Sequence, residues 1–268
     1  MTDEKLAEIQ ARIKEDYDFV VNSGYRCLGV FLQGSQNYQL DYEESDIDTK
    51  AIIIPSLEDV VLNKQPVSTT HVREDSAHID LKDIRLMFNN FRKQNINFLE
   101  ILFTKYKYVN PDYADFWQKL VDQREVIAHY DNYAAVNCIN GMILEKRAAL
   151  CKPYPSTQDK IEKYGYDPKQ LHHILRANEF QVRFIAGEPY EECLIPYDTA
   201  YLVQVKAHGE MFTVEEAVQL ADEVVVASGK VKDRYKETHP RVINASVDDL
   251  LNKVVYEVIK KSFKADIL

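Results

Sequence analysis

Residues 26–55 read RCLGVFLQGSQNYQLDYEESDIDTKAIIIP. Two runs in this stretch, 26–32 and 46–54, have the length and the apolar character of short buried strands, and Pro55 closes the second run. The first run stops at Gly34-Ser35. The stretch therefore predicts two strands with a polar segment between them.

Two carboxylates stand at the head of the second predicted strand. Because side chains alternate between the two faces of a strand, Asp46 and Asp48 are expected on one face, about 6–7 Å apart along the chain. Mg²⁺ prefers oxygen ligands in octahedral geometry and usually keeps substrate phosphates in its shell. Two ions about 3.5–4 Å apart can stabilise the attacking and the leaving oxygen of an in-line displacement. Asp46 and Asp48 are therefore candidate ligands for Mg²⁺ or Mn²⁺.

The Gly34-Ser35 turn supplies the complementary half of a nucleotide site. A glycine lets the backbone approach a phosphate, and successive amides at such a turn form a concavity that binds anions. The hydroxyl of Ser35 is a further donor for a triphosphate. A plain turn followed by two solvated aspartates is the simpler interpretation. The order of the two elements after a buried strand, with ten residues between Ser35 and Asp46, favours the nucleotide site.

The composition of the whole chain sets the class of protein. The 268 residues suggest two domains, and 46% hydrophobic with 28% charged residues is ordinary for a soluble globular protein. A formal net charge of -10 opposes non-specific binding to nucleic acid, although a divalent ion can still supply positive charge for NTP. The four cysteines lie far apart without a C-x-x-C pair, which argues against a zinc site or a disulfide framework. The N-terminus resembles neither a signal peptide nor a membrane span, so a cytoplasmic location without a membrane partner is expected.

Periodicity assigns the remaining elements. Apolar spacing over 6–20 predicts a first helix that ends before Gly24. A loop or irregular hairpin is expected over 63–76, then a third strand over 77–81, then a helix whose apolar face begins with Leu81. Beyond Pro111 the pattern is helical, with candidate helices at 112–128, 131–151, 168–186, 197–208, 214–229 and 247–264. We therefore expect an α+β fold: a small mixed sheet with flanking helices in residues 1–130, then an all-helical domain in residues 131–268.

The motif resembles the signature of the nucleotidyltransferase superfamily typified by DNA polymerase beta. That signature is Gly-Gly or Gly-Ser, a gap of about ten residues, then Asp-x-Asp or Asp-x-Glu. The closer resemblance is to a bacterial and phage branch of predicted nucleotidyltransferases that includes proteins associated with RNA-repair ligases. It is carried by Gly34-Ser35-x-x-Tyr38-x-Leu40, Ser45-Asp46-x-Asp48, the segment 93–100 (KQNINFLE) and Gly165-Tyr166-Asp167-x-Lys169-x-x-x-His173-x-x-Arg176.

The resemblance implies a third acidic residue on a later strand. Asp80 fits the predicted third strand, whereas Asp83 begins the next helix and is also explained as a charge in a first helical turn. We favour Asp80 and keep Asp83 as the alternative. The implied metal site, with Mg²⁺ or Mn²⁺, then comprises Asp46, Asp48 and Asp80. The third carboxylate is also the natural candidate to take the proton of an acceptor hydroxyl.

The resemblance also extends nucleotide binding into the helical half. Lys169, His173 and Arg176 are spaced 4 and 3, which places them on one helix face and points three basic groups the same way. Residues 145–176 hold seven Lys or Arg against four acids, in contrast to the acidic chain as a whole. A solvated helix face is the simpler interpretation for the lysines at 160 and 163. For His173 and Arg176 the resemblance favours the phosphate interpretation, since arginine stabilises phosphoryl charge through fixed donors.

The sequence therefore predicts a metal-dependent nucleotidyltransferase that moves a nucleoside monophosphate from NTP, ATP being the first candidate, to a hydroxyl acceptor. Gly34, Ser35, Tyr38, Lys169, His173 and Arg176 are the predicted nucleotide-binding residues, in a site between the two domains. RNA, a protein and a small molecule stay open as acceptors, and the oligomeric state stays open. Two rival hypotheses are a non-catalytic nucleotide-binding or regulatory protein on this fold and a helical RNase that uses Arg234 and His239.

Overall fold

The computed structural model describes residues 2–42 and 45–267. The chain divides into two compact units. Unit 1 comprises Met1–Asn37, Ser45–Tyr130 and Ile243–Leu268, and unit 2 comprises Tyr38–Glu44 and Asp131–Val242. The predicted division at 130/131 coincides with one of these junctions. Residues 243–268, which the sequence pattern assigned to the helical domain, belong to unit 1. The segment Tyr38–Glu44, between the Gly34-Ser35 turn and Asp46, belongs to unit 2.

Unit 1 is built on a small mixed sheet. Its strands are β1 (Arg26–Gln33), β2 (Asp48–Ile54), β3 (Ser68–Val72), β4 (His78–Asp83) and β5 (Lys107–Val109), in the order β3-β4-β2-β1-β5. The β2 and β4 strands run parallel, and the other neighbours are antiparallel. The α+β class with a small mixed sheet before a helical region is confirmed.

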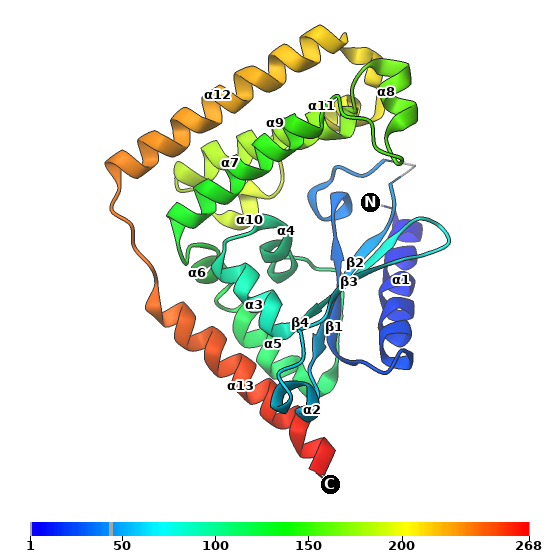
Figure 1. Ribbon diagram of the computed structural model, residues 1–268, viewed down its shortest axis with the longest axis vertical. Coiled ribbons are helices and arrows are strands. Elements are labelled where there is room, and N and C mark those ends of the chain that lie inside the picture. Colours follow the sequence, from blue (N-terminus) through cyan, green and yellow to red (C-terminus); the bar gives the residue numbers. More distant parts are fainter. Residues whose placement is uncertain (1, 43–44, 268) are drawn as a thin grey trace. The chain divides into compact units, whose positions relative to one another are not determined.

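Helix α1 (Asp3–Asn22) covers one face of this sheet (Figure 1). Thr2 caps the helix by accepting a hydrogen bond from the backbone N–H of Lys5, and Ile9, Ile13 and Val20 are buried. They pack against Ile47, which precedes β2, and against apolar side chains of the strands: Cys27, Val30, Leu32, Ala51, Ile53, Ile79 and Leu81. The 3.6-residue spacing of α1 and the alternation of the strands thus produce one shared core.

Other helices lie on the opposite face of the sheet. Helices α3 (Ile84–Arg92), α5 (Ala114–Val121) and α13 (Ala245–Ile267) lie on that side in Figure 1, where Phe31 on β1 contacts Trp117 on α5 with ring centroids 4.3 Å apart. The shorter elements of unit 1 are α2 (Leu57–Val61), α4 (Ile96–Leu99), η2 (Glu100–Leu102), η3 (Pro111–Tyr113) and α6 (Arg124–Ala128). The short helix η1 (Ser35–Tyr38) follows β1.

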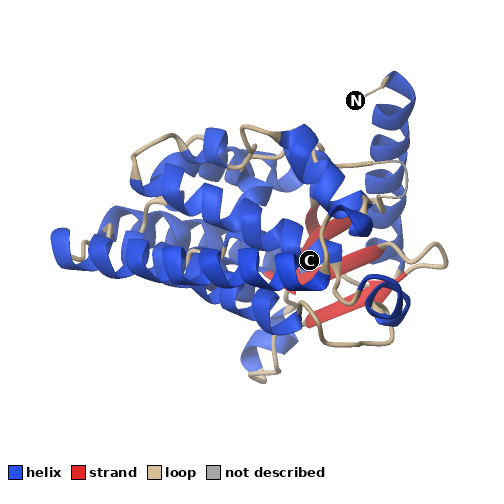
Figure 2. Cartoon of the chain, turned by 90° about the horizontal axis from the view of Figure 1, so that it is seen from above, coloured by secondary structure: helices blue, strands red, loops and turns tan. Residues whose placement is uncertain are grey.

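Unit 2 is helical. Its long helices are α7 (Asn132–Ala149), α9 (Pro168–Ile185), α11 (Thr199–Ala207) and α12 (Val214–Thr238), joined by α8 (Gln158–Tyr164), α10 (Tyr190–Cys193) and η4 (Gly209–Met211). Helix α9 packs against α7, α11 and α12. In Figure 2 the strands are confined to the sheet of unit 1. Within the described residues, no helix combines the length and apolar character that a bilayer span requires.

The structure corrects several predicted boundaries. Strand β2 begins at Asp48 rather than at Asp46, and Leu81 lies in β4 rather than in the following helix. The predicted loop 63–76 contains β3, whose residues are all exposed and give no apolar alternation. The predicted helix 112–128 is divided among η3, α5 and α6. Helix α12 continues to Thr238, nine residues past the predicted end at residue 229.

Candidate functional site

The turn after β1 is fixed by side-chain hydrogen bonds. Gly34 has a φ of +88°, a left-handed conformation that strongly favours glycine, and the space where a Cβ would stand is open. The side chain of Asn37 donates to the carbonyl of Leu32 at 2.9 Å and accepts from the hydroxyl of Thr104 at 2.6 Å. The backbone that carries Ser35 is therefore held at the end of β1.

The sheet register brings this turn to the start of β2. Gln33 pairs with Asp48 in the antiparallel β1–β2 ladder, so the turn that follows Gln33 lies beside the residues that precede Asp48. Buried Gln36 joins the two segments, because its Nε2 donates to the backbone carbonyl of Asp46 at 2.7 Å. The structure thus places Gly34 and Ser35 next to the Asp46–Asp48 segment.

The two carboxylates of this segment differ in their surroundings. Asp48 is half-buried, and its Oδ1 accepts from the backbone N–H of His78 at 2.8 Å, with the Nδ1 of the same residue at 3.3 Å. Asp46 is exposed and precedes the strand, so strand alternation does not fix its direction as the sequence analysis assumed. Among the residues that the structure describes, neither carboxylate forms an ion pair with a lysine or an arginine.

Asp80 lies on the same face as Asp48. Lys50 follows Asp48 by two residues in β2 and pairs with Asp80 in the parallel β2–β4 ladder. The Oδ2 of Asp80 accepts from the Nζ of Lys50 at 3.0 Å, and its Oδ1 lies 3.0 Å from the Nζ of Lys82. The hydroxyl of Thr70 donates to that same Oδ1 at 3.4 Å. Asp80 is therefore held by two ammonium groups and one hydroxyl.

The two lysines that bind Asp80 were absent from the candidate residues inferred from sequence. Lys50 is 3% exposed, and its Nζ lies 4.0 Å from the ring centroid of Phe98. Burial lowers the pKa of Lys50, and the ion pair with Asp80 opposes that effect. Strand alternation could have identified both lysines, since Lys50 shares a face with Asp48 and Lys82 shares a face with Asp80.

Asp83, the alternative third carboxylate, has a different role. It is the N-cap of α3, is 2% exposed, and accepts from the backbone N–H of Arg85 at 2.8 Å. The Arg85 guanidinium also forms an ion pair with it at 2.6 Å. Asp83 follows Asp80 by three positions in β4, so the two carboxylates leave opposite faces of the strand.

In unit 2 the predicted basic residues lie along α9. Asp167 caps this helix by accepting from the backbone N–H of Lys169 at 3.0 Å. Lys169 is exposed, whereas Arg176 is half-buried with its guanidinium 3.5 Å from the ring centroid of Tyr38. Tyr38 is the last residue of η1, the helix that begins at Ser35. Arg176 therefore contacts the predicted nucleotide-binding residue Tyr38 through its ring.

The two histidines of α9 are expected to be uncharged at neutral pH. Burial lowers the pKa of His172 to about 4, and its Nδ1 lies 2.8 Å from the carbonyl of Leu202, to which it donates. Burial also lowers the pKa of His173 well below its usual range, and the positive charge of Arg176 acts in the same direction. The face predicted to carry three basic groups thus carries two cations and a neutral imidazole.

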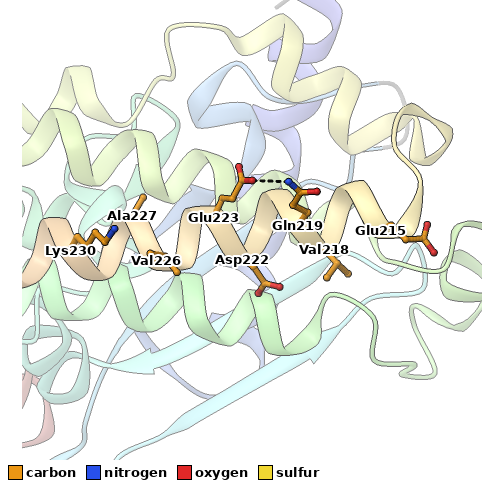
Figure 3. Close-up of a pocket in the computed structure, with 8 residues that line it drawn as sticks. All are labelled: Glu215, Val218, Gln219, Asp222, Glu223, Val226, Ala227 and Lys230. Atoms are coloured by element: carbon orange, nitrogen blue, oxygen red, sulfur yellow. Dashed lines mark hydrogen bonds between the residues drawn. The ribbon is translucent and has the colours of Figure 1, made fainter.

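The hollow on α12 and the residue pair of the RNase hypothesis contain none of the predicted nucleotide-binding or metal-binding residues. The hollow drawn in Figure 3 is lined by one exposed face of α12, where Gln219 donates to Glu223 at 2.9 Å, and it contains none of the predicted site residues. Arg234 and His239, the pair of the RNase hypothesis, lie at the C-terminal end of α12. The His239 ring stacks on Tyr235 at a centroid distance of 4.3 Å.

The donor chemistry of unit 1 fits a divalent ion that brings its own phosphate ligands. The Asp46–Asp48 segment offers carboxylate oxygens without a competing Lys or Arg, and Mg²⁺ binds through one or two carboxylates plus substrate phosphates in many proteins. Within the described residues, no three Asp, Glu, His or Cys side chains are grouped closely enough to hold a metal ion by themselves. Residues that would hold it are Asp46 and Asp48, with Asp80 on the same face.

Comparison with known proteins gave no relative: no family model matches the chain, and no curated protein matches it.

Proposed function

We propose that the protein is a metal-dependent nucleotidyltransferase whose catalytic residues lie at the start of β2 and on the neighbouring β4 in unit 1. The single observation that carries this proposal is the pairing of Gln33 with Asp48. It puts the Gly34-Ser35 turn, which we propose binds phosphate, beside two carboxylates that have no lysine or arginine partner in the described part of the chain. A phosphate-binding backbone next to a cation-binding pair is the arrangement that an NTP–Mg²⁺ complex requires.

The proposed reaction is an in-line displacement at the α-phosphate of NTP. The backbone of Gly34 and the hydroxyl of Ser35 bind and orient the triphosphate. Asp46, Asp48 and Asp80 hold Mg²⁺ or Mn²⁺, which when bound polarises the phosphoryl oxygens and stabilises the charge that develops on the leaving pyrophosphate. Asp80 takes the proton of the acceptor hydroxyl, the bond from the acceptor oxygen to the α-phosphorus forms, and the bond from that phosphorus to pyrophosphate breaks.

Residues of α9 are proposed to contribute to nucleotide binding. Within unit 2, the Arg176 guanidinium lies 3.5 Å from the ring centroid of Tyr38, another of the residues proposed to bind nucleotide. Lys169 and Arg176 supply positive charge, while the neutral His173 is proposed to bind nucleotide by hydrogen bonds rather than by charge. RNA, a protein hydroxyl and a small molecule remain the candidate acceptors.

The test is transfer of a labelled nucleoside monophosphate. Purified protein is incubated with each α-labelled NTP, Mg²⁺ and separate panels of RNA, protein and small-molecule acceptors. Labelled acceptor together with released pyrophosphate is the expected result, with ATP as the first donor to be tried. Tight NTP binding without transfer to any acceptor would favour a non-catalytic nucleotide-binding protein. RNA cleavage in the absence of NTP would favour the RNase hypothesis.

A further inference from the structure

The carboxylate of Asp80 interacts with two lysines that differ in their exposure to solvent. Its Oδ2 accepts from Lys50, and its Oδ1 lies 3.0 Å from the ammonium of Lys82. Lys50 is 3% exposed and is enclosed by Asp80 and the ring of Phe98. The side chain of Lys82 is 15% exposed, and its ammonium also donates to the hydroxyl of Ser68 at 2.7 Å, a residue at the exposed edge strand.

The cost of breaking these two ion pairs is unequal. Among the described residues, Asp80 is the only carboxylate that pairs with Lys50. If Asp80 turned away, the buried ammonium of Lys50 would be left without a counterion, which is strongly unfavourable. If Lys82 turned away from Asp80, its ammonium would keep Ser68 and would gain water, because β3 is exposed. Oδ2 is therefore the fixed oxygen of Asp80, and Oδ1 is the oxygen that can change partner.

We propose that Lys82 is a counterion that a divalent cation displaces from Asp80, and that Lys50 is the positioning residue that keeps Asp80 in place during the exchange. This inference rests on the proposed function, because the ion is the one held by Asp46 and Asp48. Asp48 and Asp80 leave the same face of neighbouring parallel strands, so the freed Oδ1 faces the side of the sheet on which Asp48 lies. The lysine neutralises the carboxylate while no metal is bound, and the metal replaces that charge.

The inference makes a specific claim about Mn²⁺ affinity. Calorimetric titration of the full chain with Mn²⁺ alone is carried out on the wild type, Lys82→Met, Asp80→Asn and the double variant. Removing the competing ammonium is expected to tighten the Kd for Mn²⁺ about five-fold. In the Asp80→Asn background the same lysine substitution is expected to change the Kd less than about two-fold, because the contested oxygen is no longer a carboxylate.

A matched control removes a lysine from the other side of the sheet. Lys14 lies on α1, where it forms an ion pair with Asp18, and Lys14→Met is expected to leave the Kd for Mn²⁺ within about two-fold of the wild type. Melting temperatures of all variants are compared first, and Lys82→Gln replaces Lys82→Met if the latter does not fold.

The outcomes separate this inference from the proposed function. Tightening that depends on Asp80 supports both. Binding of Mn²⁺ by the wild type with no effect of Lys82→Met, or with an equal effect in the Asp80→Asn background, overturns the displacement of Lys82 by the cation and leaves the proposed metal site standing. Failure of the wild type to bind Mn²⁺ at millimolar concentration would overturn the proposed metal site and this inference together.

Discussion

The candidate residues of unit 1 and those of unit 2 are brought together in different ways. In unit 1, residues from β1, β2 and β4 meet because strand register aligns segments that are up to about thirty positions apart, as the pairing of Lys50 with Asp80 illustrates. In unit 2, Lys169, His173 and Arg176 share one face of a single helix. The comparison teaches that the sheet combines opposite charges, whereas α9 gathers like charges and keeps its histidines neutral.

The largest expected effect tests the unit 1 side of this comparison. Asp46→Asn together with Asp48→Asn should lower transfer at least about a thousand-fold, because the divalent ion loses both carboxylates that have no lysine or arginine partner in the described residues. The fold should persist, since neither carboxylate has a lysine or arginine partner in the described residues. Steady-state rates and circular dichroism check this. The control is Asp115→Asn with Asp122→Asn, which changes two exposed residues of the same unit. Near wild-type transfer by the Asp46→Asn, Asp48→Asn variant would refute the metal assignment.

The next effect concerns stability and separates Asp80 from Asp46. Asp80→Ala should lower the free energy of unfolding by about 3 kcal/mol, because it removes the partner of the buried Lys50 ammonium. Asp46→Ala should change that free energy by less than about 0.5 kcal/mol, because Asp46 is exposed and its side chain forms no ion pair with a lysine or arginine in the described residues. Urea denaturation measures both. Equal, small changes would mean that the Lys50–Asp80 pair does not organise the sheet face.

The next prediction concerns unit 2 and replaces Arg176, one of the two cations on the predicted nucleotide-binding face of α9. Arg176→Ala should lower kcat/KM by about 2–4 kcal/mol in transition-state terms, comparable to the loss of one preorganised donor. Lys163→Ala should have little effect, since Lys163 is exposed and lies beside the ring of Tyr164. Rates are compared after the melting temperatures are shown to agree. Equal, small losses in both variants would leave the chemistry to unit 1 alone.

The last prediction is a pH dependence of the free energy of unfolding that arises from His172 in unit 2. The pKa of His172 is lowered to about 4 in the folded chain, so the folded state favours neutral imidazole. Its contribution is therefore fully present above pH 6.5 and is lost as the pH falls from 6.5 through 4, by at most about 3 kcal/mol. The groups that act on it are Arg176, Lys206 and Lys169. Urea midpoints between pH 7 and 4 should fall less steeply for His172→Asn, and identical slopes would contradict the buried, neutral state.

Sequence patterns predicted the parts of the fold that depend on local periodicity. The spacing of Ile9, Ile13 and Val20 predicted α1, and the apolar runs around the motif predicted β1 and most of β2. Strand β3 was missed because strand formation there depends on its ladder with β4 rather than on an apolar face. The start of β2 was placed two residues early: Gln36 binds the carbonyl of Asp46 outside the sheet, a side-chain interaction that no spacing encodes.

The candidate site was predictable to the extent that it depends on strand alternation. The spacing of Asp46, Asp48 and Asp80 was available in the sequence. Lys82 lies two positions after Asp80 on the same strand, so alternation indicates that they share a face. The pairing of Asp80 with Lys50 depends on the parallel register between β2 and β4, which a single sequence does not specify. The neutral state of His173 likewise depends on burial by other helices of the fold and not on its position along α9.

The most direct test of the account is nucleotide binding with and without a divalent ion. Calorimetry is carried out with ATP on the wild type in Mg²⁺ and in EDTA, and on the Asp46→Asn, Asp48→Asn double variant in Mg²⁺. We predict that ATP binds the wild type only with Mg²⁺, because carboxylates without a cation repel a triphosphate, and that the double variant loses this Mg²⁺-dependent binding. Equal affinity in Mg²⁺ and in EDTA would contradict a metal-dependent site at Asp46 and Asp48 and would point to a purely basic nucleotide pocket.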